Sequence, residues 1–99
     1  MNPIEAAQAL PARVAFFVAA AVQSPGCRLH PAMREALLRA LAIPTPAGPN
    51  AEAVAALMSL HVEPAEVAAH HTQLRATGDL LHARDAMGFI AALPASAWL

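Results

Sequence analysis

Nine prolines divide this 99-residue chain into short segments. Pro3, Pro31 and Pro64 stand where helices can begin, because a proline in the first helical turn gives up no N–H that the helix needs. The stretch 43–50, IPTPAGPN, holds three prolines and a glycine, so it cannot form regular structure. The prolines therefore predict several short elements joined by a stiff connector.

The N-terminal helical segment is expected over residues 3–23, where Pro11 either restarts the helix or kinks it. Its second half is apolar nearly all round, and such a helix needs cover on more than one side. The sequence leaves two ways to bury this apolar surface. The helix is either the central core helix of a monomer or part of a homodimer interface, and the dimerisation residues would then be Val14, Phe16, Phe17, Val18 and Val22.

The apolar content of the chain comes mainly from alanine, leucine and valine, since 58% of the residues are hydrophobic but only 4% are aromatic. Small side chains of this kind favour short, closely packed helices. Ninety-nine residues are enough for one modest core. We therefore expect a mainly α fold in a single domain, residues 1–99.

The stretch 62–93 is the most informative about the type of fold. A helix is expected to begin at Pro64, and Gly78 favours its end because glycine tolerates the left-handed conformation found there. Beyond it, residues 80–83 and 89–93 can form two short strands joined by a turn. This order of elements predicts a winged helix with a short β-hairpin wing.

A further helix over residues 80–93 is the alternative to the wing. The alanines of this stretch prefer helix over strand, and Asp79 is suited to cap such a helix. Gly88 would then lie in the middle of the helix at a cost of about 1 kcal/mol, whereas it suits a hairpin turn. The wing is therefore our expectation, and an all-α five-helix bundle is the alternative.

The helices expected over 31–42, 51–60 and 64–77, followed by the hairpin, resemble the winged helix-turn-helix of arsenical-repressor-type (ArsR-like) transcriptional regulators. The local match with that family's recognition helix and the start of its wing is Val67-x-x-His70-x-x-x-Leu74-Arg75-x-x-Gly78-x-Leu80. The resemblance implies a small transcriptional regulator that binds double-stranded DNA as a homodimer, with its helix-turn-helix and wing over residues 30–93.

This sequence departs from the family pattern in three places. His71 stands where the family usually has an apolar residue, the helix over 51–60 lacks the cysteine pair of metal-sensing members, and the chain has no closing dimerisation helix after the wing. The metal site of those members is therefore not implied here.

The DNA contacts implied by the resemblance lie on the 64–77 helix and at the tip of the wing. Gln73 can pair with adenine and His70 can donate to guanine or phosphate. Arg75 can contact phosphate or the minor groove, or it can instead pair with Asp79 or Asp85 in an intradomain ion pair. The candidate DNA-binding residues are Glu66, Ala69, His70, Thr72, Gln73, Arg75 and Arg84.

The charge of the chain gives no general attraction for nucleic acid. Lysine is absent, and six arginines against seven acidic residues leave a formal charge of -1. Any DNA contact must therefore come from a local cluster of arginines. The second hypothesis is accordingly a protein–protein interaction module, with the same fold or as a plain helical bundle, that does not bind DNA.

Other functional classes find little support. No nucleophile–base motif and no glycine-rich phosphate loop is present, so neither an enzyme nor a cofactor is expected. His70 and His71 point about 100° apart on a helix and do not form the i, i+4 pair of many zinc sites, so no metal is expected; Cys27 would be the most plausible additional ligand. His30, His61 and His82 lie on separate elements.

Cys27 is the single cysteine, so no intramolecular disulfide can form, and we expect a cytoplasmic protein. The apolar run 14–22 before Ser24-Pro25-Gly26-Cys27 superficially resembles a lipoprotein leader. It lacks the positive start of such a leader and is too short for a membrane span of about 20 residues. No membrane association is therefore expected.

Overall fold

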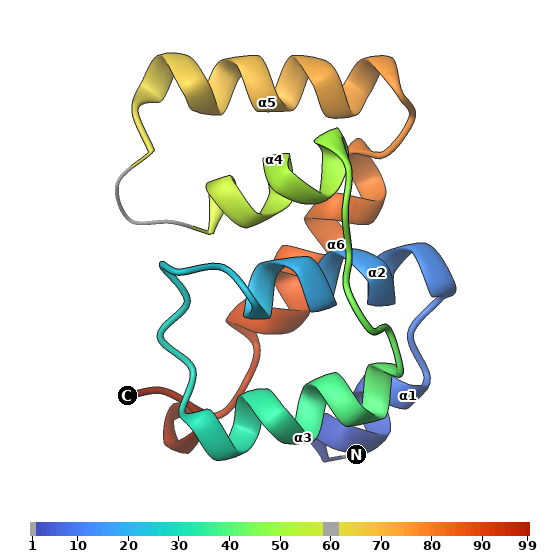
Figure 1. Cartoon of the computed structure of the whole chain (residues 1–99), viewed down its shortest axis with the longest axis vertical. Coiled ribbons are helices and arrows are strands. Elements are labelled where there is room, and N and C mark those ends of the chain that lie inside the picture. The colour runs from blue at the N-terminus through green and yellow to red at the C-terminus, as the bar shows by residue number, and fades with distance from the viewer. Residues whose placement is uncertain (1, 59–61) are drawn as a thin grey trace.

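The computed structural model describes residues 2–58 and 62–99 of the chain. Across these residues the chain forms six α-helices and one 3₁₀ turn (Figure 1). The helices are α1 (Pro3–Gln8), α2 (Ala12–Val22), α3 (Pro31–Leu41), α4 (Pro49–Leu57), α5 (Pro64–Ala76) and α6 (Leu80–Ala91), and the 3₁₀ turn is η1 (Ala95–Ala97).

The expected β-hairpin wing is wrong, because α6 occupies its residues. Ala83, Ala86 and Ile90 follow one another at i, i+3 and i+7 and are fully buried, so one face of α6 belongs to the core. Burial of this face offsets the cost of Gly88 in the middle of the helix. Within residues 2–58 and 62–99 no strand forms, and the fold is mainly helical, as in the all-α alternative.

α2 lies at the centre of the molecule. Eight of its eleven residues are buried, and α6, α4 and α3 pack around it. α2 is thus a central core helix within the chain, as in the first of the two alternatives. The dimer interface predicted along it is wrong for four of its five residues, because the chain's own helices enclose these side chains: Val14, Phe17, Val18 and Val22. Phe16 alone of the five is half-buried.

Pro11 restarts the helix rather than kinking it, since α1 and α2 are separate helices on either side of residues 9–11. α1 packs against α3 at the other end of the molecule from α5 (Figure 1). Asn2 caps α1, because its Oδ1 accepts a hydrogen bond of 2.8 Å from the backbone N–H of Glu5. The separate α1 makes six helices where the alternative bundle had five.

The proline-rich connector runs along the molecule from α3 to α4 (Figure 1). Gly48, with φ +112°, is the N-cap of α4 and Pro49 is its first residue. Asparagine is a residue type that suits an N-cap, but Asn50 is the second residue of α4 because the helix begins earlier. Because the Asn50 side chain does not cap α4, it can form hydrogen bonds with residues of α5.

The C-terminal end of the chain packs against the loop that precedes α3. The backbone N–H of His30 donates to the carbonyl of Ala97 (2.8 Å), and the N–H of Leu99 donates to that of Arg28 (2.9 Å). Leu29 and Trp98 form an isolated antiparallel bridge between these two segments. These contacts hold the C-terminal segment against residues 28–30, where Ala97 is buried.

Candidate functional site

The junction between α5 and α6 is a three-residue turn at Gly78. The N–H of Gly78 donates to the carbonyl of Arg75 (3.2 Å), and the N–H of Asp79 donates to that of Leu74 (2.8 Å). These two bonds form a Schellman motif, in which the residue after the helix cap is left-handed. Gly78 has φ +80°, so the predicted helix end at this glycine is confirmed.

Asp79 carries the densest set of side-chain interactions at this junction. It is only 7% exposed, and both carboxylate oxygens accept hydrogen bonds from Arg13 of α2, Oδ1 from Nε (3.0 Å) and Oδ2 from Nη2 (2.6 Å). Nδ1 of His82 lies 3.3 Å from Oδ1. The paired fork geometry makes this one of the stronger kinds of ion pair.

The hydrogen bonds from Arg13 hold the pKa of the Asp79 carboxyl well below its usual value, against the opposing effect of burial. Hydrogen bonds from Asn50 and His82 act in the same direction. The same pairing with Asp79 raises the pKa of Arg13. The Arg13 guanidinium carbon also lies 4.9 Å and 4.6 Å from the ring centroids of Phe16 and Phe17, within cation–π range.

Asn50 of α4 links this ion pair to α5. Its Nδ2 donates to Asp79 Oδ2 (2.7 Å) and to Thr77 Oγ1 (2.8 Å), and its Oδ1 accepts from Gln73 Nε2 (3.0 Å). Both N–H groups of the amide and one oxygen lone pair are therefore in use. One side chain thus joins three segments of the chain.

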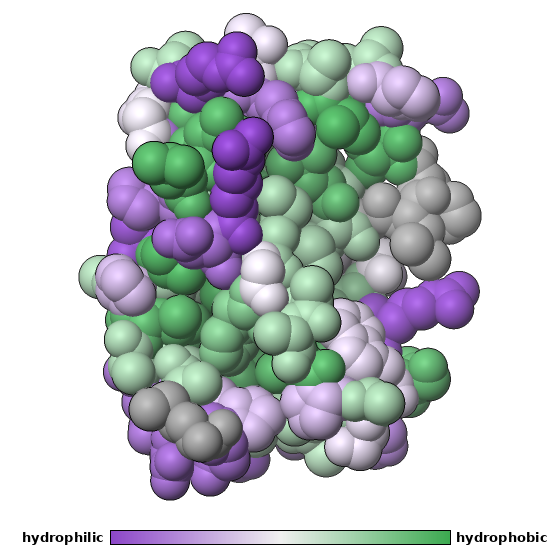
Figure 2. Space-filling view, turned by 180° about the vertical axis from the view of Figure 1, so that it is seen from behind, coloured by the Kyte–Doolittle hydropathy of each residue, from purple (hydrophilic) through white to green (hydrophobic). Residues whose placement is uncertain are grey.

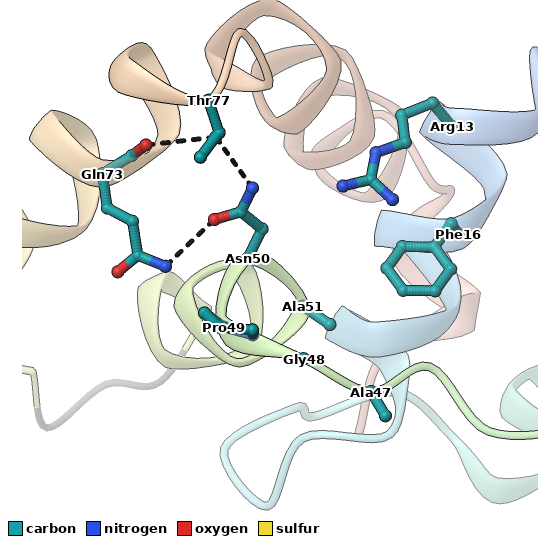
Figure 3. Close-up of a pocket in the computed structure, with 9 residues that line it drawn as sticks. All are labelled: Arg13, Phe16, Ala47, Gly48, Pro49, Asn50, Ala51, Gln73 and Thr77. Carbon is teal, nitrogen blue, oxygen red and sulfur yellow. Dashed lines mark hydrogen bonds between the residues drawn. The ribbon is translucent and has the colours of Figure 1, made fainter.

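A pocket of about 390 Å³ opens beside this network (Figure 3). Arg13 and Phe16 lie on one side of it, and Asn50, Gln73 and Thr77 lie on the other. Residues 47–49 pass below. None of its lining residues is a cysteine, a histidine or a carboxylate. Because Asp79 neutralises Arg13 and the amides bond to one another, the pocket's polar groups serve mainly to join the helices.

Local sequence patterns did not predict this network. Arg13 was the available signal, since it is the only charged residue of the apolar helix α2 and a charge beside a core needs a partner. The sequence favours Asp79 as a helix cap or as the ion-pair partner of Arg75, and an asparagine at position 50 suits a helix cap. Neither side chain caps a helix, because each is used in contacts between helices.

The candidate DNA-binding residues do not form one surface. Six of the seven lie on α5 or at its C-terminal end, where Glu66, Ala69, Thr72 and Arg75 are exposed and His70 and Gln73 are half-buried. Gln73 donates to Asn50, so its amide is not free to pair with adenine. Arg84, expected at the tip of the wing, lies on α6 and is exposed.

Within residues 2–58 and 62–99, Arg75 forms no ion pair with Asp79 or Asp85. Asp79 pairs with Arg13 instead and lies close to His82. The segment 63–85 carries two arginines against four acidic residues, a formal charge of -2. The region around α5 therefore has no positive charge excess to attract a phosphate backbone.

No metal-binding group is seen among the described residues, where no three His, Cys, Asp or Glu side chains lie close enough to hold an ion. His61 lies outside those residues. Cys27 is buried and lines a separate pocket of about 200 Å³ with Met58 and Trp98. No helix in the described part of the chain is long and apolar enough to cross a membrane.

The outer side of α6 carries exposed apolar surface. Leu81 is 69% exposed, and Gly88 follows it two turns later, also exposed and with no atom within 4 Å of where a Cβ would lie. A groove of about 390 Å³ lies at the end of this helix between Phe89 and α1, lined by Pro3, Ala6, Phe89, Ala92, Leu93 and Pro94. Figure 2, which views the molecule from behind, shows broad apolar areas interrupted by polar side chains.

No protein-family model, curated protein or solved structure matches the chain.

Proposed function

We propose that this chain is a small helical module that binds an amphipathic helix of a partner protein along the outer side of α6. The observation that carries this proposal is Leu81, a large apolar side chain 69% exposed on the same helix as an apolar groove. A single exposed leucine on a protein surface needs no explanation. An exposed leucine in line with an open glycine and a groove supports a binding surface.

The spacing of these features suits a helical partner. Leu81 and Gly88 are seven residues apart, roughly 10 Å along the helix, so they lie on one side of α6 about two turns apart. Helices bound in grooves use apolar anchors at such spacings. The groove beside Phe89 can take one large apolar anchor of the partner, and Gly88 allows the partner's backbone to come close.

Charge further defines the partner. Arg84 and Asp85 are exposed between Leu81 and Gly88, so α6 presents both signs of charge at the middle of this surface. A complementary helix carries an acidic residue opposite Arg84 and a basic residue opposite Asp85. The surface of a polyanion such as DNA is complementary to Arg84 alone.

The test compares two leucine variants. The wild-type chain is used to capture partners from its native cells, each partner is purified, and binding is then measured by isothermal titration calorimetry. We expect Leu81→Glu to weaken binding at least tenfold. Leu99→Glu is the matched control, because Leu99 is 76% exposed at the C-terminus, away from α6, and its substitution should leave the affinity unchanged.

Equal binding by Leu81→Glu and the wild type would overturn the proposal. So would a Leu81-dependent homodimer detected by light scattering, since the occupant of the surface would then be a second copy of the chain.

DNA binding by α5 is a second candidate. It is favoured by the position of α5 at the outer edge of the molecule, next to α4, with Arg75 exposed (Figure 1). Fluorescence anisotropy with the DNA upstream of its own gene, across a salt series and against a scrambled duplex, tests it. Specific binding lost in Arg75→Ala and kept in Arg39→Ala, an exposed arginine on α3, would support this candidate over the first.

A further inference from the structure

Few side chains attach α5 to the rest of the molecule. Leu74 is the one buried residue among its thirteen. α5 lies along the outer edge of the fold, where it packs mainly against α4 and meets α6 only near its C-terminal end (Figure 1). By contrast, α2 packs against α3, α4 and α6 and contributes eight buried residues to the core.

Among the residues that the structure describes, Asn50 makes the side-chain hydrogen bonds that join the end of α5 to another helix. This side chain accepts a hydrogen bond from Gln73 and donates one to Thr77, at 3.0 Å and 2.8 Å. Thr77 Oγ1 lies within hydrogen-bond distance of the carbonyls of Gln73 and Leu74, which fixes its hydroxyl at the end of the helix. Asn50 therefore holds the last turn of α5 against the first turn of α4.

Asp79 belongs to the body of the protein rather than to α5. Its side-chain partners are Arg13 on α2, Asn50 on α4 and His82 on α6, so these contacts persist if α5 moves away. Its backbone N–H is bonded to α5, at the carbonyl of Leu74. Gly78 separates Asp79 from α5 and has φ +80°, in a region that glycine enters without strain. The firm ion pair and the weakly held helix thus lie on opposite sides of this glycine.

We propose that α5 detaches from the α2–α4–α6 body as a unit, with Asn50 as its latch and Gly78 as its pivot. Detachment breaks the two bonds between Asn50 and the end of α5, opens the bond from the Asp79 N–H to the Leu74 carbonyl, and uncovers Leu74. It leaves the Arg13–Asp79 pair and the core around α2 intact. The detached form exposes the side of α4 that α5 covers, and its existence does not depend on the binding role of α6.

Partial openings of this kind require less free energy than global unfolding. Native-state hydrogen exchange therefore tests the proposal. We expect the hydrogen-bonded amides of residues 68–76 to exchange at least roughly 100-fold faster than those of the α2 core, with a smaller dependence on added denaturant because less surface is exposed.

Asn50→Ala should speed exchange in α5 roughly tenfold while the α2 amides keep their relative protection, since the partly buried hydrogen bonds that hold the end of α5 lose their shared partner. The matched control is Asn2→Ala, because Asn2 is the only other asparagine and caps α1 instead; it should leave α5 unchanged. Thr77→Val keeps the shape of the side chain and removes one of the two bonds. This variant replaces Asn50→Ala in the test if Asn50→Ala fails to fold. We expect it to speed hydrogen exchange less than tenfold and only in α5.

Exchange of α5 and α2 at a common rate, with a common denaturant dependence, would show that α5 opens only on global unfolding and would overturn the proposal. Equal acceleration of both helices by Asn50→Ala, or by Thr77→Val, would overturn it as well.

Discussion

α2 and α5 have similar lengths and similar alanine contents but opposite roles in the fold. Of the eleven residues of α2 eight are buried, whereas among the thirteen of α5 only Leu74 is. Four of the five alanines of α2 are buried, and the four alanines of α5 are all exposed. The burial of an alanine here is thus decided by its neighbours.

Those neighbours are Phe17 and Val18 in α2, and glutamate, histidine, glutamine and arginine in α5. Large apolar side chains gain most from burial and draw the small residues of their face into the core. α5 has a single leucine on its inner face and is held by polar contacts at its C-terminal end instead. One helix therefore builds the core, while the other is added to its edge.

The largest effect should come from a matched pair of valine substitutions. Val18 is fully buried in α2, and Val67 is half-buried in α5. We expect Val18→Ala to lower the free energy of unfolding by about 2–3 kcal/mol, because apolar contacts are lost and a cavity is left. Val67→Ala should cost less than about 1 kcal/mol. Urea unfolding followed by circular dichroism measures the free energy of unfolding of both variants. Equal losses of stability would contradict the view that α2 builds the core and α5 lies at its edge.

The next effect concerns the ion pair at the boundary between these regions. Asp79→Asn should cost about 2 kcal/mol at pH 7, because the buried site loses the charge that accepts two bonds from Arg13. Asp85→Asn is the control, since Asp85 is exposed on α6 and should change stability by less than about 0.5 kcal/mol. A loss of the same size in both variants would mean that the fork geometry adds nothing.

The same ion pair predicts a dependence on pH. The pKa of Asp79 is lowered in the folded protein, so the unfolded chain takes up the proton first as the pH falls. The stability contributed by Asp79 is therefore complete at neutral pH and is lost progressively below about pH 4. Urea unfolding between pH 6 and pH 3 should show a shallower loss in Asp79→Asn than in the wild type. Parallel curves would exclude Asp79 as a source of the acid sensitivity.

The smallest effects come from two glycines and should have opposite signs. Gly78→Ala should destabilise the protein by about 1 kcal/mol, because an alanine is strained at φ +80°. Gly88→Ala should stabilise it by about 0.5–1 kcal/mol, because Gly88 lies within a helix and a Cβ there meets no atom within 4 Å. Thermal unfolding of the two variants checks both signs, and a destabilised Gly88→Ala would show that this position tolerates no side chain.

Local sequence signals located most of the helices. Pro3, Pro31 and Pro64 each open a helix as expected, and Gly78 ends α5. α3 ends at Leu41, one residue earlier than expected. Its C-cap Ala42 has φ 57°, a left-handed conformation that the sequence gives no reason to expect of an alanine. These features depend on φ preferences and on missing N–H groups, which act within a few residues.

Residues 80–93 show where local signals were insufficient. Their alanines favoured a helix and Gly88 favoured a turn, and the two preferences differ by only about 1 kcal/mol. Packing decided the outcome, because a helix places Ala83, Ala86 and Ile90 together against the core. The winged helix was expected from the order of the predicted elements. That order carries no information on which residues of 80–93 would be buried against the core.

The sequence by itself determined a mainly helical fold with a core rich in small residues, because composition and proline spacing limit the chain to short helices. Only the tertiary structure decided that α2 is enclosed by its own chain, that α5 lies at the edge, and that Arg13, Asn50 and Asp79 meet. These three residues are up to 66 positions apart. Contacts over such separations depend on how the helices pack, and no local preference of the chain encodes them.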